Sequence, residues 1–155
     1  MKKSSSITKQ EAIARLMKLC SRAEKSSFEI ELKLKTWGLQ HQSEEIVNLL
    51  RKENFLNDGR FVKAFVHDKI IINKWGRIKI KYYLLKSRIP GDIIEKELNS
   101  IDIQKYHKII TEELNRKKLS LNNLPSRRQK AKLFAFGNQR GYEMEYIRDF
   151  IEESD

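Results

Sequence analysis

The fold is decided by residues 56–89, LNDGRFVKAFVHDKIIINKWGRIKIKYYLLKSRI, where two apolar-patterned stretches flank a break at Trp75-Gly76. The first stretch starts after Asn57-Asp58, and the second, residues 76–88, alternates lysines with isoleucines, tyrosines and leucines. Helical spacing predicts two helices here, and Pro90 is placed to be the first residue of a third. In the first helix we expect an inward face made by Phe61, Ala64, Phe65 and Ile72. We expect Val62, Val66 and Ile71 on its flank.

The same layout recurs along the chain. Three junctions between second and third helices, Trp37-Gly38-Leu39, Ser87-Arg88-Ile89 and Arg140-Gly141-Tyr142, fall about 50 residues apart. Such periodicity predicts an all-α tandem array of three three-helix repeats that form an elongated, curved superstructure, right-handed or similar. The expected divisions are a flexible tail over residues 1–6 and repeats over 7–55, 56–100 and 101–155.

Helix-start signals support this organisation. Thr8 with Glu11, and Ser26 with Glu29, have capping-box spacing. Ser43 is expected to cap the third helix of the first repeat, and Asp102 starts the third round.

The composition indicates a soluble globular protein that stays in the cytoplasm. Of 155 residues, 39% are hydrophobic and 34% charged, and no apolar run approaches the roughly 20 residues that cross a bilayer. Lys2-Lys3 is followed by serines rather than by a signal-peptide core. Cys20 is the single cysteine, which excludes an intramolecular disulfide and favours a small buried hydrophobe.

The positive charge of the chain is unevenly distributed. The formal net charge is +11, and neither residues 69–91 nor residues 114–142 contain Asp or Glu. The first fifty residues mix both signs. A polyanionic partner, nucleic acid or an acidic protein surface, is therefore expected to meet the middle and the end of the chain.

The central stretch also resembles a known family. Residues 56–66, LNDGRFVKAFV, are similar to the (D/N)-D-x-R-F-A-x-A-F-V segment of the RecX family of bacterial recombination regulators, and residues 139–142, QRGY, are similar to its R-R-G-F turn. Three residues depart from the pattern: Arg88 replaces a glycine, Tyr142 a phenylalanine, and Gly137 stands where a leucine packs.

The resemblance implies a non-enzymatic regulator in recombination, DNA repair and the SOS response. Such a protein binds the RecA filament, or RecA itself, and restrains its ATP hydrolysis and strand exchange. Single-stranded or duplex DNA is a further expected partner, through its phosphates, and we expect a monomer without cofactors.

Basic residues in the two acid-free windows are the candidates for contact with DNA or the filament. Arg77, Lys81 and Arg88 are expected on one solvated side of their helix, able to meet successive phosphates and to tolerate reversal to glutamate. The full candidate set is Lys69, Lys74, Arg77, Lys81, Arg88, Arg127, Arg128, Lys132 and Arg140. Core positions are expected, ahead of stacking on bases, for Trp37, Trp75, Tyr82 and Tyr83, and Tyr82 is the most open of them to stacking.

Two other classes of function stay open. A plain DNA-binding protein would use helix-turn-helix-like pairs to read a duplex groove. An enzyme acting on nucleic acid would need a metal site or clustered carboxylates, but His41, His67 and His107 fall in different repeats. The adjacent pairs Glu44-Glu45 and Glu112-Glu113 are expected on solvated faces.

Overall fold

The computed structural model describes residues 6–154, and in this part of the chain the secondary structure is entirely helical. The first repeat contains α1 (Lys9–Arg22), α2 (Ser27–Thr36), a 3₁₀ turn (Gln40–Gln42) and α3 (Ser43–Lys52). The second contains α4 (Asp58–Ile71), α5 (Arg77–Lys86) and α6 (Gly91–Asn99), and the third α7 (Ile103–Leu119), α8 (Ser126–Arg140) and α9 (Met144–Glu153). The expected tail, residues 1–6, lies outside the described residues except for Ser6. None of the described helices is long and apolar enough to span a membrane.

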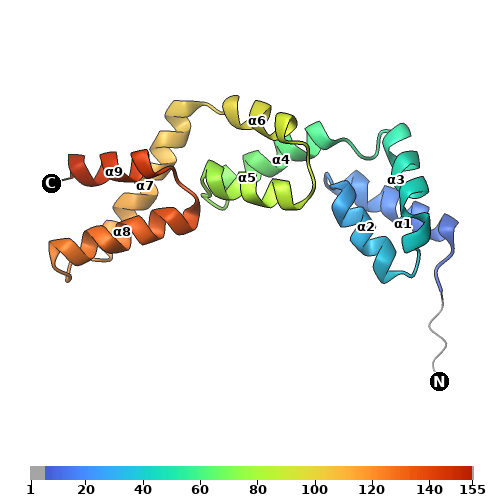
Figure 1. Ribbon diagram of the computed structural model, residues 1–155, viewed down its shortest axis with the longest axis horizontal. Helices are drawn as coiled ribbons and strands as arrows, with labels where there is room; N and C mark the ends of the chain where they lie inside the picture. The colour runs from blue at the N-terminus through green and yellow to red at the C-terminus, as the bar shows by residue number, and fades with distance from the viewer. Residues whose placement is uncertain (1–5, 155) are drawn as a thin grey trace, which may run out of the picture.

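The three helix triplets follow one another in an elongated, bent array (Figure 1). The second helices α2, α5 and α8 lie along its lower edge in that view. Backbone contacts join the C-terminal end of α8 to the start of α5, and Arg88, just past α5, reaches Glu31 and Phe28 of α2. The second helices therefore form one row that runs from α8 through α5 to α2.

The turn after each second helix has the same left-handed backbone. Gly38, Arg88 and Gly141 have φ values of 76°, 59° and 88°. These are the three junction positions aligned in the sequence, so the repeat is confirmed at the level of backbone geometry. Of the three, Arg88 has a side chain, and the left-handed backbone conformation disfavours any residue with a Cβ.

Most of the expected helix starts are confirmed. Capping boxes form at Thr8 with Glu11 and at Ser26 with Glu29, and the side chain of Asp102 accepts from the backbone N–H groups of Gln104 and Lys105. Pro90 lies one residue before α6 instead of starting it.

The expected Ser43 cap is wrong. The 3₁₀ turn over residues 40–42 leads directly into α3, so Gln42 takes the cap position and Ser43 becomes the first helical residue. Its hydroxyl is buried without a hydrogen-bond partner.

The described residues form two separate hydrophobic cores. One is built by the first repeat together with Leu56, and it contains Leu16, Ile30 and Leu34. The other is shared by the second and third repeats and runs from Phe61 and Ile80 to Ile147. Surface ion pairs, Arg60 with Glu24, Arg51 with Asp58 and Arg88 with Glu31, connect the first repeat to the second. The array thus consists of one single repeat and one fused pair.

The inward face of α4 differs from the expectation. Val62, Val66 and Ile70, spaced four residues apart, are buried together with Phe61. Ile72 was expected inward, which is wrong, because α4 ends at Ile71 and Ile72 is 69% exposed in the following turn. The buried row is therefore rotated toward the residues expected on the flank.

The second and third repeats meet at a joint, where the turn at Gly76 contacts the turn at Arg140-Gly141 backbone to backbone. The N–H of Gly76 donates to the carbonyl of Arg140 at 2.7 Å, and the N–H of Ile78 donates to the carbonyl of Gly141 at 3.1 Å. A Cβ on Gly76 would lie 2.2 Å from the Gly141 carbonyl oxygen, and one on Gly141 would lie 2.3 Å from Lys79 Cβ. Only glycine at both positions allows this approach.

The neighbouring Tyr142 secures the same contact. Its hydroxyl donates to the Lys74 carbonyl at 2.6 Å, and burial raises the pKa of Tyr142 to about 12. The hydroxyl therefore remains a hydrogen-bond donor at neutral pH. The phenylalanine of the family pattern cannot make this bond.

Substitution of Gly141 by alanine tests the joint, with Gly38→Ala as its matched control. Both changes place a Cβ at positive φ, which costs about 1–2 kcal/mol. A Cβ at Gly38 meets nothing within 4 Å, whereas the one at Gly141 collides with Lys79. Urea denaturation should therefore show a loss for Gly141→Ala at least about 2 kcal/mol greater than for Gly38→Ala. Equal losses would contradict a tightly fitted joint.

Independent cores predict independent unfolding. Trp37 packs on the first core and Trp75 on the shared core, so Trp75→Phe and Trp37→Phe variants each leave one fluorescent reporter. Ile30 and Ile80 occupy equivalent, fully buried positions. Ile30→Ala should lower the stability reported by Trp37 by about 2–4 kcal/mol and leave the Trp75 transition in place, and Ile80→Ala should do the reverse. A single shared transition in both backgrounds would show that the array unfolds as one unit.

Candidate polyanion-binding surface

The starts of α5 and α8 concentrate positive charge. A helix N-terminus carries a partial positive charge and usually has acidic residues nearby, as α1, α2, α3, α4, α6 and α9 do. The first turns of α5 and α8 have none and begin with Arg77 and with Arg127-Arg128. Interaction with the helix dipole therefore does not favour these arginines.

Arg77 belongs to a half-buried network instead of a solvated surface. Its guanidinium forms an ion pair with Glu143 at 3.1 Å and lies over the ring of Tyr106. The Tyr106 hydroxyl accepts from the backbone N–H of Arg77 and donates to the Glu143 carboxylate. The side chains of Arg77 and Glu143 are 24% and 18% exposed. The expected solvated placement of Arg77 beside Lys81 and Arg88 is therefore wrong.

The titration behaviour of this network agrees with a structural role. Burial raises the pKa of Tyr106 well above its usual range. Burial alone would lower the pKa of Arg77, but the hydrogen bond and charge of Glu143 raise it overall. Arg77 therefore keeps its charge and Tyr106 its hydroxyl proton, and the network ties α5 to α7 and α9.

The other candidates near α5 are partly engaged. Lys81 is exposed and pairs with Glu95, and exposed Arg88 pairs with Glu31 while its guanidinium covers Phe28. The ammonium of Lys69 lies 4.6 Å from the centre of the Trp75 ring. Lys74 sits in the turn before α5 with φ 59°, and its carbonyl accepts from Tyr142.

On α8 the candidates divide by position. Arg127, Arg128 and Lys132 are exposed, and no described residue pairs with them. Arg128 and Lys132 are four residues apart and therefore share one side of the helix. Arg140, at the other end, is half-buried between Glu113, Phe136 and the Asn73 carbonyl. The structure thus brings together Arg127, Arg128 and Lys132, and places Arg140 in the joint with the second repeat.

Glu113 departs from the expected solvated face. It is only 4% exposed and forms ion pairs with Arg116 and Arg140, both at 3.4 Å. Its neighbour Glu112 is exposed and pairs with Lys108, so the two carboxylates have different roles.

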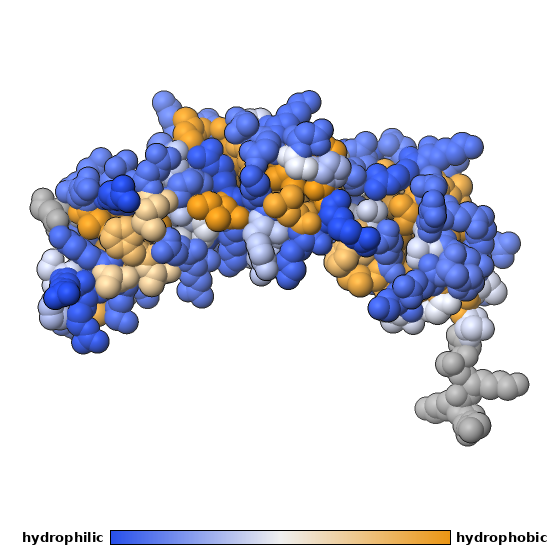
Figure 2. All heavy atoms as spheres, viewed as in Figure 1, coloured by the Kyte–Doolittle hydropathy of each residue, from blue (hydrophilic) through white to orange (hydrophobic). Residues whose placement is uncertain are grey.

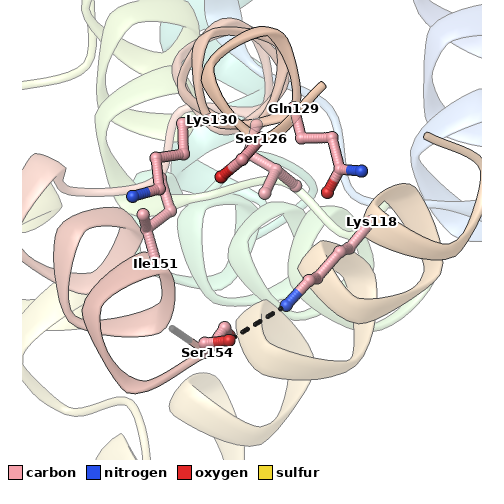
Figure 3. Close-up of a pocket in the computed structure, with 7 residues that line it drawn as sticks. Lys118, Ser126, Gln129, Lys130, Ile151 and Ser154 are labelled. Atoms are coloured by element: carbon pink, nitrogen blue, oxygen red, sulfur yellow. Dashed lines mark hydrogen bonds between the residues drawn. The ribbon is translucent and has the colours of Figure 1, made fainter. Parts of the chain in front are cut away.

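A small polar hollow of about 190 Å³ lies beside the start of α8 (Figure 3). Two of its polar side chains are already hydrogen-bonded to the backbone. Lys118 donates to the Ser154 carbonyl (Figure 3), and Gln129 donates to the Leu124 carbonyl. Lys118 therefore ties the end of α7 to the residue after α9, and Gln129 fixes the connector that precedes α8.

Histidine and cysteine form no common centre in residues 6–154, where no group of three metal-ligating side chains occurs. His41, His67 and His107 are all exposed, as expected. Cys20 is half-buried against the first core, and burial raises the pKa of its thiol, which makes it a poor nucleophile at neutral pH.

Sequence reasoning missed the partners of the joint. Glu143 and Tyr146, which hold Arg77, lie far from it in the chain, and nothing in their spacing connects them. A usable signal was the acid-free first turn of α5, because an arginine there without a local acid needs a distant one.

Known proteins match this chain over most of its length. The family model described as RecX, second three-helix domain, matches residues 57–98. Proteins named Regulatory protein RecX from Clostridium beijerinckii and Clostridium acetobutylicum are each 29% identical over 88% and 92% of this chain, which correspond to 65% and 68% of their own length. A third, from Streptococcus agalactiae, is 30% identical over 70% of this chain and 41% of its own. The chain thus spans about two thirds or less of these relatives.

Solved structures share the fold. A crystal structure of regulatory protein RecX superposes with a TM-score of 0.82 and 19% identity, covering 93% of this chain and 71% of that one. The crystal structure of RecX from Lactobacillus salivarius superposes with a TM-score of 0.78 and 19% identity, covering 93% of this chain and 94% of that one. The expected all-α array of three-helix repeats is thereby confirmed. Together with the matches in sequence, it shows that this chain belongs to the RecX family.

Proposed function

We propose that this chain is a regulatory protein that binds the RecA recombinase, or the filament that RecA forms on DNA, and lowers its ATPase and strand-exchange activities. The relatives are regulatory proteins by name. The observation that carries the proposal is the continuous row of second helices along one edge, with unpaired cations at its α8 end.

The shape of the row suits a repetitive partner. The helices α8, α5 and α2 follow end to end, so the array offers a long edge instead of a single pocket. An edge of this kind can contact successive subunits of a filament. Bridging adjacent subunits would resist the rearrangement that ATP turnover requires, which gives inhibition without any catalytic group.

The α8 end of the row suits phosphate. Arg127, Arg128 and Lys132 meet an anion without first breaking an internal ion pair, and the partial positive charge of the helix start adds to them. Lys69, Lys74, Lys81 and Arg88 extend the positive edge toward the first repeat, while Arg77 and Arg140 support it from the joint.

The second candidate is a groove-reading DNA-binding protein. The outward side of α8 also exposes Ala131, Ala135, Asn138 and Gln139. Small and amide side chains of this kind can contact base edges in a major groove. Sequence-dependent binding to free duplex would favour this function over the regulator.

Addition of the purified chain to RecA on single-stranded DNA should reduce the rate of ATP hydrolysis in a saturable way. The expected reduction is several-fold, because bridged subunits turn over slowly. An unchanged rate at saturating chain concentration would contradict the proposal.

Reversal of the unpaired cations should weaken the contact with phosphate. Arg128→Glu with Lys132→Glu should reduce affinity for an oligo-dT strand and reduce the slope of log K against log salt by about 0.7 per lost contact. Lys18→Glu with Lys33→Glu is the matched control, because both lysines are exposed in the first repeat and the net charge changes equally. Equal losses for the two variants would point to overall charge instead of the α8 surface.

Reversal at Arg77 should destabilise the fold and not merely the contact. Arg77→Glu would oppose Glu143 in a mostly buried site and should cost about 3 kcal/mol in chemical denaturation. Lys81→Glu, on the same helix but with a side chain 47% exposed, should change stability by less than about 1 kcal/mol. Full stability of Arg77→Glu would show that the network does not support the joint.

A further inference from the structure

Helix α5 carries large apolar side chains on its outward side as well as on its inward side. Its inner side buries Ile80 and Leu84 completely, but Ile78, Tyr82 and Leu85 are 56%, 57% and 48% exposed. The side of a surface helix that faces away from the core normally carries polar or charged residues. Orange side chains accordingly break the hydrophilic surface over α5 in Figure 2. The outward side of this helix therefore lacks a covering partner in the isolated chain.

The exposed apolar residues form one stripe with lysines on both flanks. Ile78, Tyr82 and Leu85 follow the i, i+4, i+7 spacing of a single helix side. At 3.6 residues per turn, Lys81 falls on one flank of this stripe, and Lys79 and Lys86 fall on the other. No acidic residue occurs between Lys69 and Gly91 along the chain, although Glu95 of α6 reaches Lys81.

The equivalent sides of α2 and α8 are different. The positions of Ile78, Tyr82 and Leu85 correspond to Phe28, Leu32 and Lys35 in α2 and to Ala131, Ala135 and Asn138 in α8. Phe28 is covered by Arg88, and the α8 residues are small or polar. Three large apolar side chains thus coincide on the outward side of α5 alone among the second helices, and the three-helix packing does not require them there.

The chemistry of the stripe favours a protein over a nucleic acid. Isoleucine and leucine gain free energy by burial against other apolar side chains but have no ring on which a base can stack. The single ring of the stripe, Tyr82, is already contacted by the Lys86 ammonium and by the edge of Tyr83. A second copy of this chain is disfavoured, because pairing two stripes would bring the flanking lysines of both copies together.

From these observations we infer that the outward side of α5 binds an acidic amphipathic helix of a partner protein. Ile78, Tyr82 and Leu85 accept the apolar side of that helix, and Lys79, Lys81 and Lys86 meet its carboxylates. The inference rests on the proposed function in one respect, since the partner is then a helix of RecA. It divides the row into a protein contact on α5 and a phosphate contact on α8.

Removal of the aliphatic side chains tests this division. Ile78→Ser with Leu85→Ser should lower affinity for RecA, measured without DNA, at least about tenfold. Affinity for oligo-dT should stay within about twofold, because no cation is lost. Both residues are half exposed, so the helical circular dichroism signal should be retained. Leu119→Ser is the control, because it removes an exposed leucine at the end of α7, away from the stripe, and should leave both affinities unchanged.

A second probe makes the result independent of RecA. A synthetic helix of about 20 residues, with leucines along one side and glutamates elsewhere, should bind the wild-type chain and lose at least about tenfold affinity for the double variant. A peptide with lysines in place of the glutamates should not bind. Equal affinity of wild type and variant for the glutamate peptide would overturn the inference.

The remaining outcomes separate the two proposals. RecA binding by wild type with no loss in the double variant would overturn the α5 contact and leave the regulator function standing. Loss of oligo-dT binding in the double variant would overturn the inference by making α5 a nucleic-acid surface. Absence of RecA binding by wild type, with stripe-dependent peptide binding, would overturn the RecA function and support the α5 site for another acidic helix.

Discussion

The contact between the Gly76 turn and the Arg140-Gly141 turn is the constraint on which the rest of the array depends. It brings two backbones together without side chains between them, and it aligns the end of α8 with the start of α5. Tyr142, Arg77, Glu143 and Arg140 all close around it. Without this joint the second helices would not form a continuous edge, and the basic and apolar surfaces would lie on unrelated units.

The joint also explains why positive charge is used in two ways. Arginines at its border are half-buried and neutralised by Glu143 and Glu113, so they hold repeats together. Cations on the outer side of α8 remain unpaired among the described residues. The acid-free window of residues 114–142 therefore contains the structural Arg140 beside the exposed Arg127 and Arg128, and the difference depends on acids outside the window.

Local signals allowed the helices, the positions of the junctions and the three-repeat order to be predicted from sequence. Thr8, Ser26, Asn57 and Asp102 cap helices because the cap and its partner are only a few residues apart. Ser43, Ile72 and Arg77 were misplaced for physical reasons: a 3₁₀ turn moved the cap, α4 ended one residue early, and the partner of Arg77 is 66 residues away. Periodicity likewise gave the inner side of α5 but did not show that its outer side is uncovered.

The division into two cores has a consequence for synthesis on the ribosome. The first repeat can bury Leu16, Ile30 and Leu50 as soon as Leu56 has emerged, because its core needs nothing downstream. The middle repeat must wait for Gly141 and Glu143, near the end of the chain, before the turn at Gly76 and the side chain of Arg77 find their partners. Until then the lysine-rich segment that follows Trp75 is attached to a folded first repeat but lacks its own packing partners. The high charge of that nascent segment helps to keep it from aggregating.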